Sequence, residues 1–216
     1  MTALALLLAD ARLPAAGHTQ SGGLEPGLAR GLDPADLPAY CRSRLATVTR
    51  TEAATAVVAR HHAWLQAPLQ PVEAAWAART PSDAMRATSR SLGRGLLRLA
   101  RKAWPEAVAH WPTDYQPPRP LVLGAIAAET GLAAVDLARV VGYDDVQTVL
   151  AAALKLLPLD PADAATWCVG LLPDVDTLAA EVADLTDPAD IPATGSPLIE
   201  GWAQAHARTT RRLFSA

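Results

Sequence analysis

Residues that favour β-strands are scarce in this chain of 216 residues. It contains one phenylalanine and three tyrosines, and its strand-forming residues never alternate with polar ones over a sustained run. Alanine, leucine and arginine dominate instead, and alanine and unbranched side chains lose little conformational freedom in a helix. Half of the residues are apolar, which is enough to bury a sizeable core. The composition therefore predicts an all-α protein.

The sequence also lacks a recognisable targeting or membrane-spanning segment. Its opening, MTALALLLADARLP, has no basic residue ahead of the apolar run, which ends at Asp10, so neither a secretory signal nor a membrane helix is expected. No later apolar run is long enough to cross a bilayer. Cys41 and Cys168 lie far apart in apolar surroundings and are expected to be buried free thiols. We therefore expect a soluble, cytoplasmic protein.

Motifs of common enzyme classes are missing. There is no Gly-x-Ser-x-Gly turn, and GHTQSGG at 17–23 lacks the lysine and the preceding strand of a phosphate-binding loop. The adjacent acids Asp144 and Asp145 do not by themselves indicate a pocket. None of the histidines has the i, i+4 spacing of a transition-metal site. The five histidines are His18, His61, His62, His110 and His206. We expect no catalytic activity.

Apolar periodicity and helix breakers divide the chain into helices. The first is apolar nearly all round, which predicts its burial, and the proline-rich stretch 105–120 predicts an exposed connector. Without an internal repeat, the pattern predicts one domain, 1–216, formed by a compact bundle of eight to ten helices. The expected helices span about 2–11, 24–31, 33–66, 72–79, 82–104, 121–130, 134–156, 161–171, 173–185 and 197–210.

Charge is distributed unevenly along the chain. Residues 1–120 carry 14 basic and 9 acidic side chains, whereas residues 121–216 carry 5 basic and 13 acidic ones. The expected helix at 82–104 places arginines four residues apart, which brings them to one face. These arginines are Arg86, Arg90, Arg94 and Arg98, with Arg101 one turn beyond. Such a face can bind nucleic acid, bind a protein partner, form internal ion pairs or remain solvated.

Two features of the expected helix at 82–104 help to decide among these four roles. Aromatic residues that would stack on bases are missing from its surroundings, so a protein partner or internal ion pairing is favoured over nucleic acid. Gly93 and Gly95 each cost a helix interior about 1 kcal/mol relative to alanine. A close approach of another helix or of a partner at this point explains why they are tolerated.

The stretch LPAAGHTQSGGLE, residues 13–25, combines a proline and three glycines with small polar residues. It can bind a phosphate, supply a metal ligand or turn the chain. Because the phosphate-binding features are missing, we expect a turn that ends the first helix and redirects the chain at a dimer or partner contact. His18 remains a weak metal-ligand candidate. Together with His206 it supports one hypothesis for the function, a small metal-binding chaperone.

Four segments, in order, resemble the urease accessory protein UreF family. LLLADARLPAAGHTQSGGLE resembles the family's opening, TSRSLGRGLLRLARKAWP its Ser-Arg-x-x-Gly-Arg segment, ALKLLPLD its basic-Leu-x-Pro-Leu segment, and HARTTRRLFSA its C-terminal His followed by Arg-Leu-Phe. Gln20 stands where the family usually carries a histidine before Ser-Gly-Gly. After Pro158-Leu159 the chain continues DPADAATW, where the family commonly has glycine and glutamines. The resemblance is that of a divergent member.

The resemblance implies an all-helical, dimeric adaptor without enzyme activity. Such an adaptor bridges the urease-docking protein UreD, also called UreH, and the nickel-carrying GTPase UreG, so that GTP hydrolysis is coupled to nickel insertion into apo-urease. It implies no stably bound cofactor, because the complex handles the nickel, and neither a nucleic-acid nor a membrane partner. The alternative is a helical nucleic-acid-binding protein that uses Arg86 to Arg101.

The resemblance also implies a set of partner-binding residues. The tail, 208–216, would bind UreD/UreH with Phe214, the chain's single phenylalanine, as an exposed anchor, and Lys155 would face the GTPase. The complete set is His18, Ser21, Gly22, Gly23, Glu25, Arg90, Arg94, Lys155, His206, Arg211, Arg212, Leu213 and Phe214.

Overall fold

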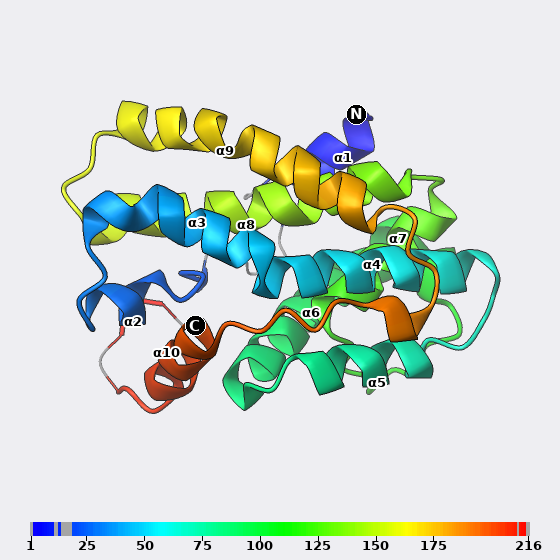
Figure 1. The fold of residues 1–216 in the computed structure, drawn as a ribbon. Helices are drawn as coiled ribbons and strands as arrows, with labels where there is room; N and C mark the ends of the chain where they lie inside the picture. Colours follow the sequence, from blue (N-terminus) through cyan, green and yellow to red (C-terminus); the bar gives the residue numbers. More distant parts are fainter. Residues whose placement is uncertain (1, 11–12, 14–18, 211, 215–216) are drawn as a thin grey trace.

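The computed structural model (Figure 1) describes residues 2–10, 13, 19–210 and 212–214. Over these residues the chain forms ten α-helices and no strand, which confirms the all-α prediction. The helices are α1 (Ala3–Leu8), α2 (Leu24–Leu28), α3 (Leu37–Ala46), α4 (Val48–Trp64), α5 (Gln70–Arg79), α6 (Asp83–Ala103), α7 (Arg119–Glu129), α8 (Ala134–Leu156), α9 (Pro161–Val182) and α10 (Pro197–Ala207). Three short 3-10 turns, η2 (Pro34–Asp36), η3 (Pro105–Val108) and η4 (Pro188–Asp190), connect them.

Helix α4 lies at the centre of the bundle and packs against α7 and α8. Its sequence from Ala53 to Ala59 is rich in small and β-branched residues and is buried throughout. A Cβ on Gly124 of α7 would lie 2.6 Å from Ala59 Cβ, so the two helices cross in close contact. Helix α9 covers α8 and α3 along one edge, and α6 packs on α7 at the opposite side (Figure 1). Nearly all of the buried apolar residues form one cluster.

The proline-rich connector 105–120 is packed in part against α6, so the prediction that it is exposed is right for only half of its residues. Val108 and Trp111 are buried, and so are Pro117 and Pro118. A Cβ on Gly93 would lie 2.1 Å from Pro117 O, so this glycine admits the connector backbone directly onto the helix. A close approach at Gly93 was expected from another helix or from a partner, and the approaching segment is instead the chain's own connector.

One continuous helix was expected at 33–66, but the chain breaks it at Thr47, between α3 and α4. The Thr47 hydroxyl donates to Ser43 O at 2.6 Å, the acceptor that a helical Thr47 N–H would use. The Thr47 N–H bonds to Arg44 O instead. Side-chain competition for a backbone acceptor of this kind bends or ends helices, and no glycine or proline signals it in the sequence.

Helix α9 departs from expectation in the opposite way, because it runs through Pro173 as one helix. A proline removes the hydrogen bond to the carbonyl of the residue four positions earlier, which is Val169. Both residues lie on the exposed face of α9, where water can hydrate that carbonyl. Two helices, 161–171 and 173–185, were therefore a wrong prediction.

Helix α1 is shorter than the expected 2–11 and only half buried. Ala5 and Leu8 are buried, but Leu6 and Leu7 are 59% and 46% exposed, so the prediction of burial all round is wrong for these two residues. Within the residues that the structure describes, no helix combines the length and the apolar character that a bilayer crossing demands.

Gly93→Ala should destabilise the protein, because the new methyl group would collide with the backbone of the connector rather than with a movable side chain. We expect a loss of about 1–3 kcal/mol in the free energy of unfolding, measured by urea denaturation. Gly170→Ala is the matched control, since Gly170 lies within α9 and a Cβ there meets nothing within 4 Å. The control should be neutral or stabilising by up to about 1 kcal/mol. Equal effects of the two substitutions would contradict this account.

Candidate partner-docking site

The Ser-Gly-Gly turn places Glu25 at the start of α2. Gly22 and Gly23 have φ angles of 60° and 80°, a left-handed conformation that glycine adopts without strain. A Cβ at these positions would lie 2.8 Å from Val149 Cγ2 and 2.9 Å from the Tyr40 hydroxyl, respectively. The Glu25 N–H donates to the Ser21 hydroxyl at 3.4 Å. Glycine is therefore needed here for both backbone angle and space.

A buried ion pair between Arg44 and Asp145 holds this turn in place. Arg44 donates to both carboxylate oxygens of Asp145, at 2.9 and 2.6 Å, and to Gly22 O at 2.6 Å. The Tyr40 hydroxyl donates to the same carbonyl at 2.7 Å. Burial would lower the pKa of Arg44, but the neighbouring Asp145 carboxylate outweighs it and raises that pKa. Arg44 thus joins α3, α8 and the turn as a permanent cation.

Glu25 holds the tail of the chain. The N–H groups of Leu213 and Phe214 donate to its two carboxylate oxygens, Oε1 at 2.6 Å and Oε2 at 2.9 Å. His206 Nε2 lies 3.5 Å from Glu25 Oε2 and 3.3 Å from Phe214 O. Both of these atoms are acceptors, so Nε2 carries the proton and donates. One carboxylate and one imidazole therefore bind the backbone on both sides of Phe214.

Phe214 is not exposed, in contrast to the expectation for a free anchor. It is 4% exposed, whereas its neighbour Leu213 is 64% exposed. Lys155 Nζ lies 5.2 Å from the centroid of the Phe214 ring, within range of a cation–π contact. The expectation was that a partner would bury the ring, because leaving an aromatic ring in water is unfavourable. Instead, the tail folds back and the chain buries the ring itself.

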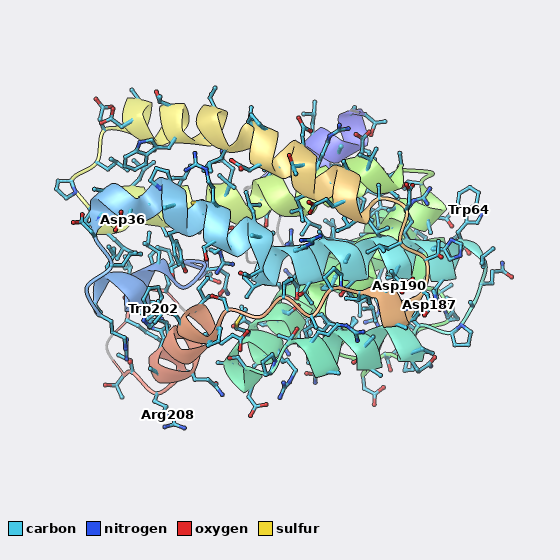
Figure 2. The ribbon with its side chains drawn as sticks, viewed as in Figure 1. Asp36, Trp64, Asp187, Asp190, Trp202 and Arg208 are labelled. Carbon is cyan, nitrogen blue, oxygen red and sulfur yellow. The ribbon has the colours of Figure 1, made fainter. Side chains whose placement is uncertain are left out.

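Segments far apart in the sequence thus meet at one place. The turn and α2 contribute Ser21, Gly22, Gly23 and Glu25. The end of α8 contributes Lys155, α10 contributes His206, and the tail contributes Leu213 and Phe214. Arg212 is exposed beside them. Trp202 and Arg208 lie at this end of the molecule, and Trp64 lies at the other (Figure 2). His18 and Arg211 fall outside the described residues.

Arg90 and Arg94 belong to a different set of contacts. Arg90 pairs with Glu73 at 2.7 Å, and its guanidinium lies 5.5 Å from the centroid of the Trp76 ring. Arg94 donates to the Gln116 side chain at 3.0 Å. Arg101 donates to Pro112 O at 2.9 Å. These guanidinium groups connect α6 to α5 and to the connector. This agrees with the hypothesis that the arginines of this helix form internal contacts.

A cavity of about 440 Å³ lies beside the docked tail. His206 and Arg212 form part of its wall, and the Arg44–Asp145 pair forms another part. The buried Thr49 hydroxyl also lines it and has no hydrogen-bond partner among the described residues. A cavity of this size with polar groups in its wall can hold several water molecules.

Two further carboxyl groups line the cavity, and burial raises the pKa of each above its ordinary value. Glu52 accepts a hydrogen bond from Trp76 Nε1 at 2.7 Å, and this bond only partly offsets the effect of burial on the pKa of Glu52. Asp144 pairs with Arg119 at 3.0 Å, and burial still dominates its pKa. Across the described parts of the chain, no three His, Cys, Asp or Glu side chains are placed together to hold a metal ion.

Sequence reasoning did not single out Arg44, Glu52 or Arg119, and it left Asp144 and Asp145 unassigned. A signal for the acids was available, because both lie in the mostly apolar stretch VVGYDDVQTVL in the middle of α8. Two adjacent carboxylates in such a helix need internal partners. The identity of those partners depends on the packing of α3 and α7, which the sequence does not show.

Comparison with known proteins gives the family. The UreF family model matches residues 32–171. The chain is 38% identical over 215 residues to the urease accessory protein UreF of Mycolicibacterium vanbaalenii, covering 98% of this chain and 97% of that protein. It is 37% identical over 224 residues to the protein of the same name from Mycobacterium marinum, covering all of both chains. By class, the chain is an accessory protein of urease rather than urease itself. More particularly, it belongs to the UreF family, as the four motifs indicated.

Asp145→Ala should strongly destabilise the protein, because it leaves the Arg44 guanidinium buried without its carboxylate. Loss of one partner of a buried pair costs about 3–5 kcal/mol, measurable by chemical denaturation. The control is Asp176→Ala, which removes an exposed pair between Asp176 on α9 and Arg139 on α8. It should cost at most about 1 kcal/mol. A loss for Asp145→Ala no larger than the control's would contradict the central role of the buried pair.

Glu52→Gln should change how stability depends on pH. The raised pKa means that folded Glu52 keeps its proton over a range in which the unfolded form has lost it, so Glu52 lowers stability as pH rises. The glutamine variant lacks this loss. Its free energy of unfolding should therefore rise relative to wild type as the pH increases above about 4, the ordinary pKa of a glutamate. Glu129→Gln, at an exposed position, should run parallel to wild type. A relative fall for Glu52→Gln over this range would refute the assignment.

Proposed function

We propose that this protein is an adaptor in the maturation of urease. It contacts a UreD/UreH-type docking protein through its tail and a UreG-type GTPase through another surface, so that GTP hydrolysis accompanies nickel insertion into apo-urease. Its membership of the UreF family supports this role, since the relatives bear the name of urease accessory proteins. The observation that carries the site is the convergence of Glu25, Lys155, His206 and Phe214 at one end of the molecule.

The same proposal includes how the protein works. It acts as a homodimer, without catalysis and without a stably bound cofactor, and the assembled complex handles the nickel. It acts in the cytoplasm, where reducing conditions suit two buried free thiols. Burial raises the pKa of Cys41 to about 12 and also raises that of Cys168, so these thiols are poor metal ligands at neutral pH.

Leu213 is the side chain through which the docked tail can meet a partner. It is exposed while its backbone N–H is held by Glu25. The buried centre of a docking surface is more apolar than the rest of the surface, so an exposed leucine held in a fixed position can contribute to one. Arg212, also exposed, adds a positive charge beside it.

The proposal predicts that a co-expressed urease operon lacking this gene yields urease with little nickel and little activity. Metal analysis of the purified urease measures the first, and urea hydrolysis measures the second. Re-supplying the wild-type gene should restore both. Unchanged nickel content without the gene would overturn the proposed function.

Complementation with variants tests the tail in the same operon. Leu213→Asp should fail to restore nickel content and should lose co-purification with the UreD/UreH-type protein. Leu198→Asp is the matched control, because Leu198 on α10 is 63% exposed but takes no part in the contacts around Glu25. An equal loss of nickel content and of co-purification with both variants would contradict a role of the tail in binding the UreD/UreH-type protein.

A further inference from the structure

We propose that the cavity lined by Thr49 is a binding site for a small uncharged molecule that joins an apolar body to one hydrogen-bonding group, as an aromatic alcohol does. The site belongs to this chain alone. It goes beyond the proposed role in urease maturation, because binding at this site requires none of the partners named there.

The cavity has the size and the access of a small-molecule site. Its volume of about 440 Å³ falls within the range of about 300–1,000 Å³ that is usual for ligand pockets. Ala87 on α6 and Ala207 on α10 form part of its wall and are also exposed to solvent. These two helices pack against each other. The cavity therefore opens between α6 and α10, and a ligand can enter without unfolding the bundle.

The Thr49 hydroxyl is the polar group in the wall that requires a ligand. Thr49 is 2% exposed, and its hydroxyl has no hydrogen-bond partner within the part of the chain that the structure describes. A buried polar group without a partner is rare and lowers stability, so the partner must come from the cavity. Because a hydroxyl both donates and accepts, a single alcohol or carbonyl group on a ligand satisfies it.

Apolar side chains from three helices form much of the remaining wall. They include Leu92 and Leu96 of α6, Leu123 of α7 and Val141 of α8. Water can supply Thr49 with a hydrogen bond, but water beside such side chains is held weakly. An apolar group that displaces weakly held water gains affinity. The wall therefore favours a molecule with an apolar body over water alone.

The charged groups of the wall favour an uncharged ligand. Among the described residues, four arginines and five acidic residues line the cavity, so their charges nearly balance. Arg44 pairs with Asp145, and Arg119 pairs with Asp144. Burial raises the pKa of Glu52, which favours its neutral form. An ionic ligand would lose its hydration shell while the buried charges around it already have partners, and this loss is unfavourable.

Four probes of similar shape test these requirements on the full-length protein: benzyl alcohol, toluene, benzoate and benzylammonium. Ligand-observed NMR titration measures the affinity of each. We expect benzyl alcohol and toluene to bind saturably at one site. Benzoate and benzylammonium should bind more weakly than benzyl alcohol, because each carries a charge into a wall whose charges are already paired.

Two pairs of variants locate the site. Thr49→Val removes the hydroxyl and keeps the shape, so it should weaken benzyl alcohol by about fivefold or more and leave toluene unchanged. Thr55→Val is its control, because the buried Thr55 hydroxyl of the same helix already donates to Thr51 O at 2.7 Å. Ala87→Trp should block the opening and abolish saturable binding of both probes. Ala180→Trp, at an exposed position of α9, should match wild type.

Each contrary outcome would overturn the proposal. If no probe binds saturably to wild type, the cavity holds water only. Tighter binding of benzoate or benzylammonium than of benzyl alcohol would contradict an uncharged ligand. If Ala87→Trp keeps its helical circular dichroism and still binds both probes, they bind elsewhere. An equal loss of benzyl alcohol affinity in Thr49→Val and Thr55→Val would contradict the role of Thr49. Because no urease protein is present, these results are independent of the proposed function.

Discussion

The buried pair between Arg44 and Asp145 is the interaction on which the candidate site depends. A guanidinium deep in an apolar bundle is tolerated only when its charge and its N–H groups are satisfied. Here the carboxylate of Asp145 and the carbonyl of Gly22 do so. The second of these contacts links the core to the surface. By holding Gly22 O, Arg44 fixes the turn that positions Glu25, and Glu25 in turn holds the tail.

The molecule therefore builds the candidate site from contacts between segments that are distant in sequence. Arg44 lies on α3, Asp145 on α8, Glu25 on α2 and Phe214 in the tail. None of the helices that carry them could hold the arrangement alone, because each supplies only one of the groups. The cavity beside the site has the same character, since its polar lining comes from paired charges on several helices. Stability of the bundle and geometry of the site rest on the same ion pairs.

Much of the fold could be predicted from local sequence, and the site could not. Helix α8 has the expected bounds, and α6 begins at its Ser82 cap, because periodicity and capping act over a few residues. The break at Thr47 and the continuous helix through Pro173 escaped prediction, because each depends on where a side chain or carbonyl faces in the folded bundle. The family motifs identified Glu25, Lys155, His206 and Phe214. They could not show that these residues contact one another or that Phe214 is buried, since both facts depend on how the tail folds back.

The way in which Glu25 binds the tail leaves the tail's sequence partly free. Its carboxylate accepts main-chain N–H groups, which every residue except proline supplies, so docking makes no demand on the side chain at position 213. That side chain is 64% exposed and can therefore change without disturbing the internal contact. Residues on one short segment are thus divided between two constraints: the backbone and Phe214 serve the fold, and Leu213 is available for adaptation to a partner.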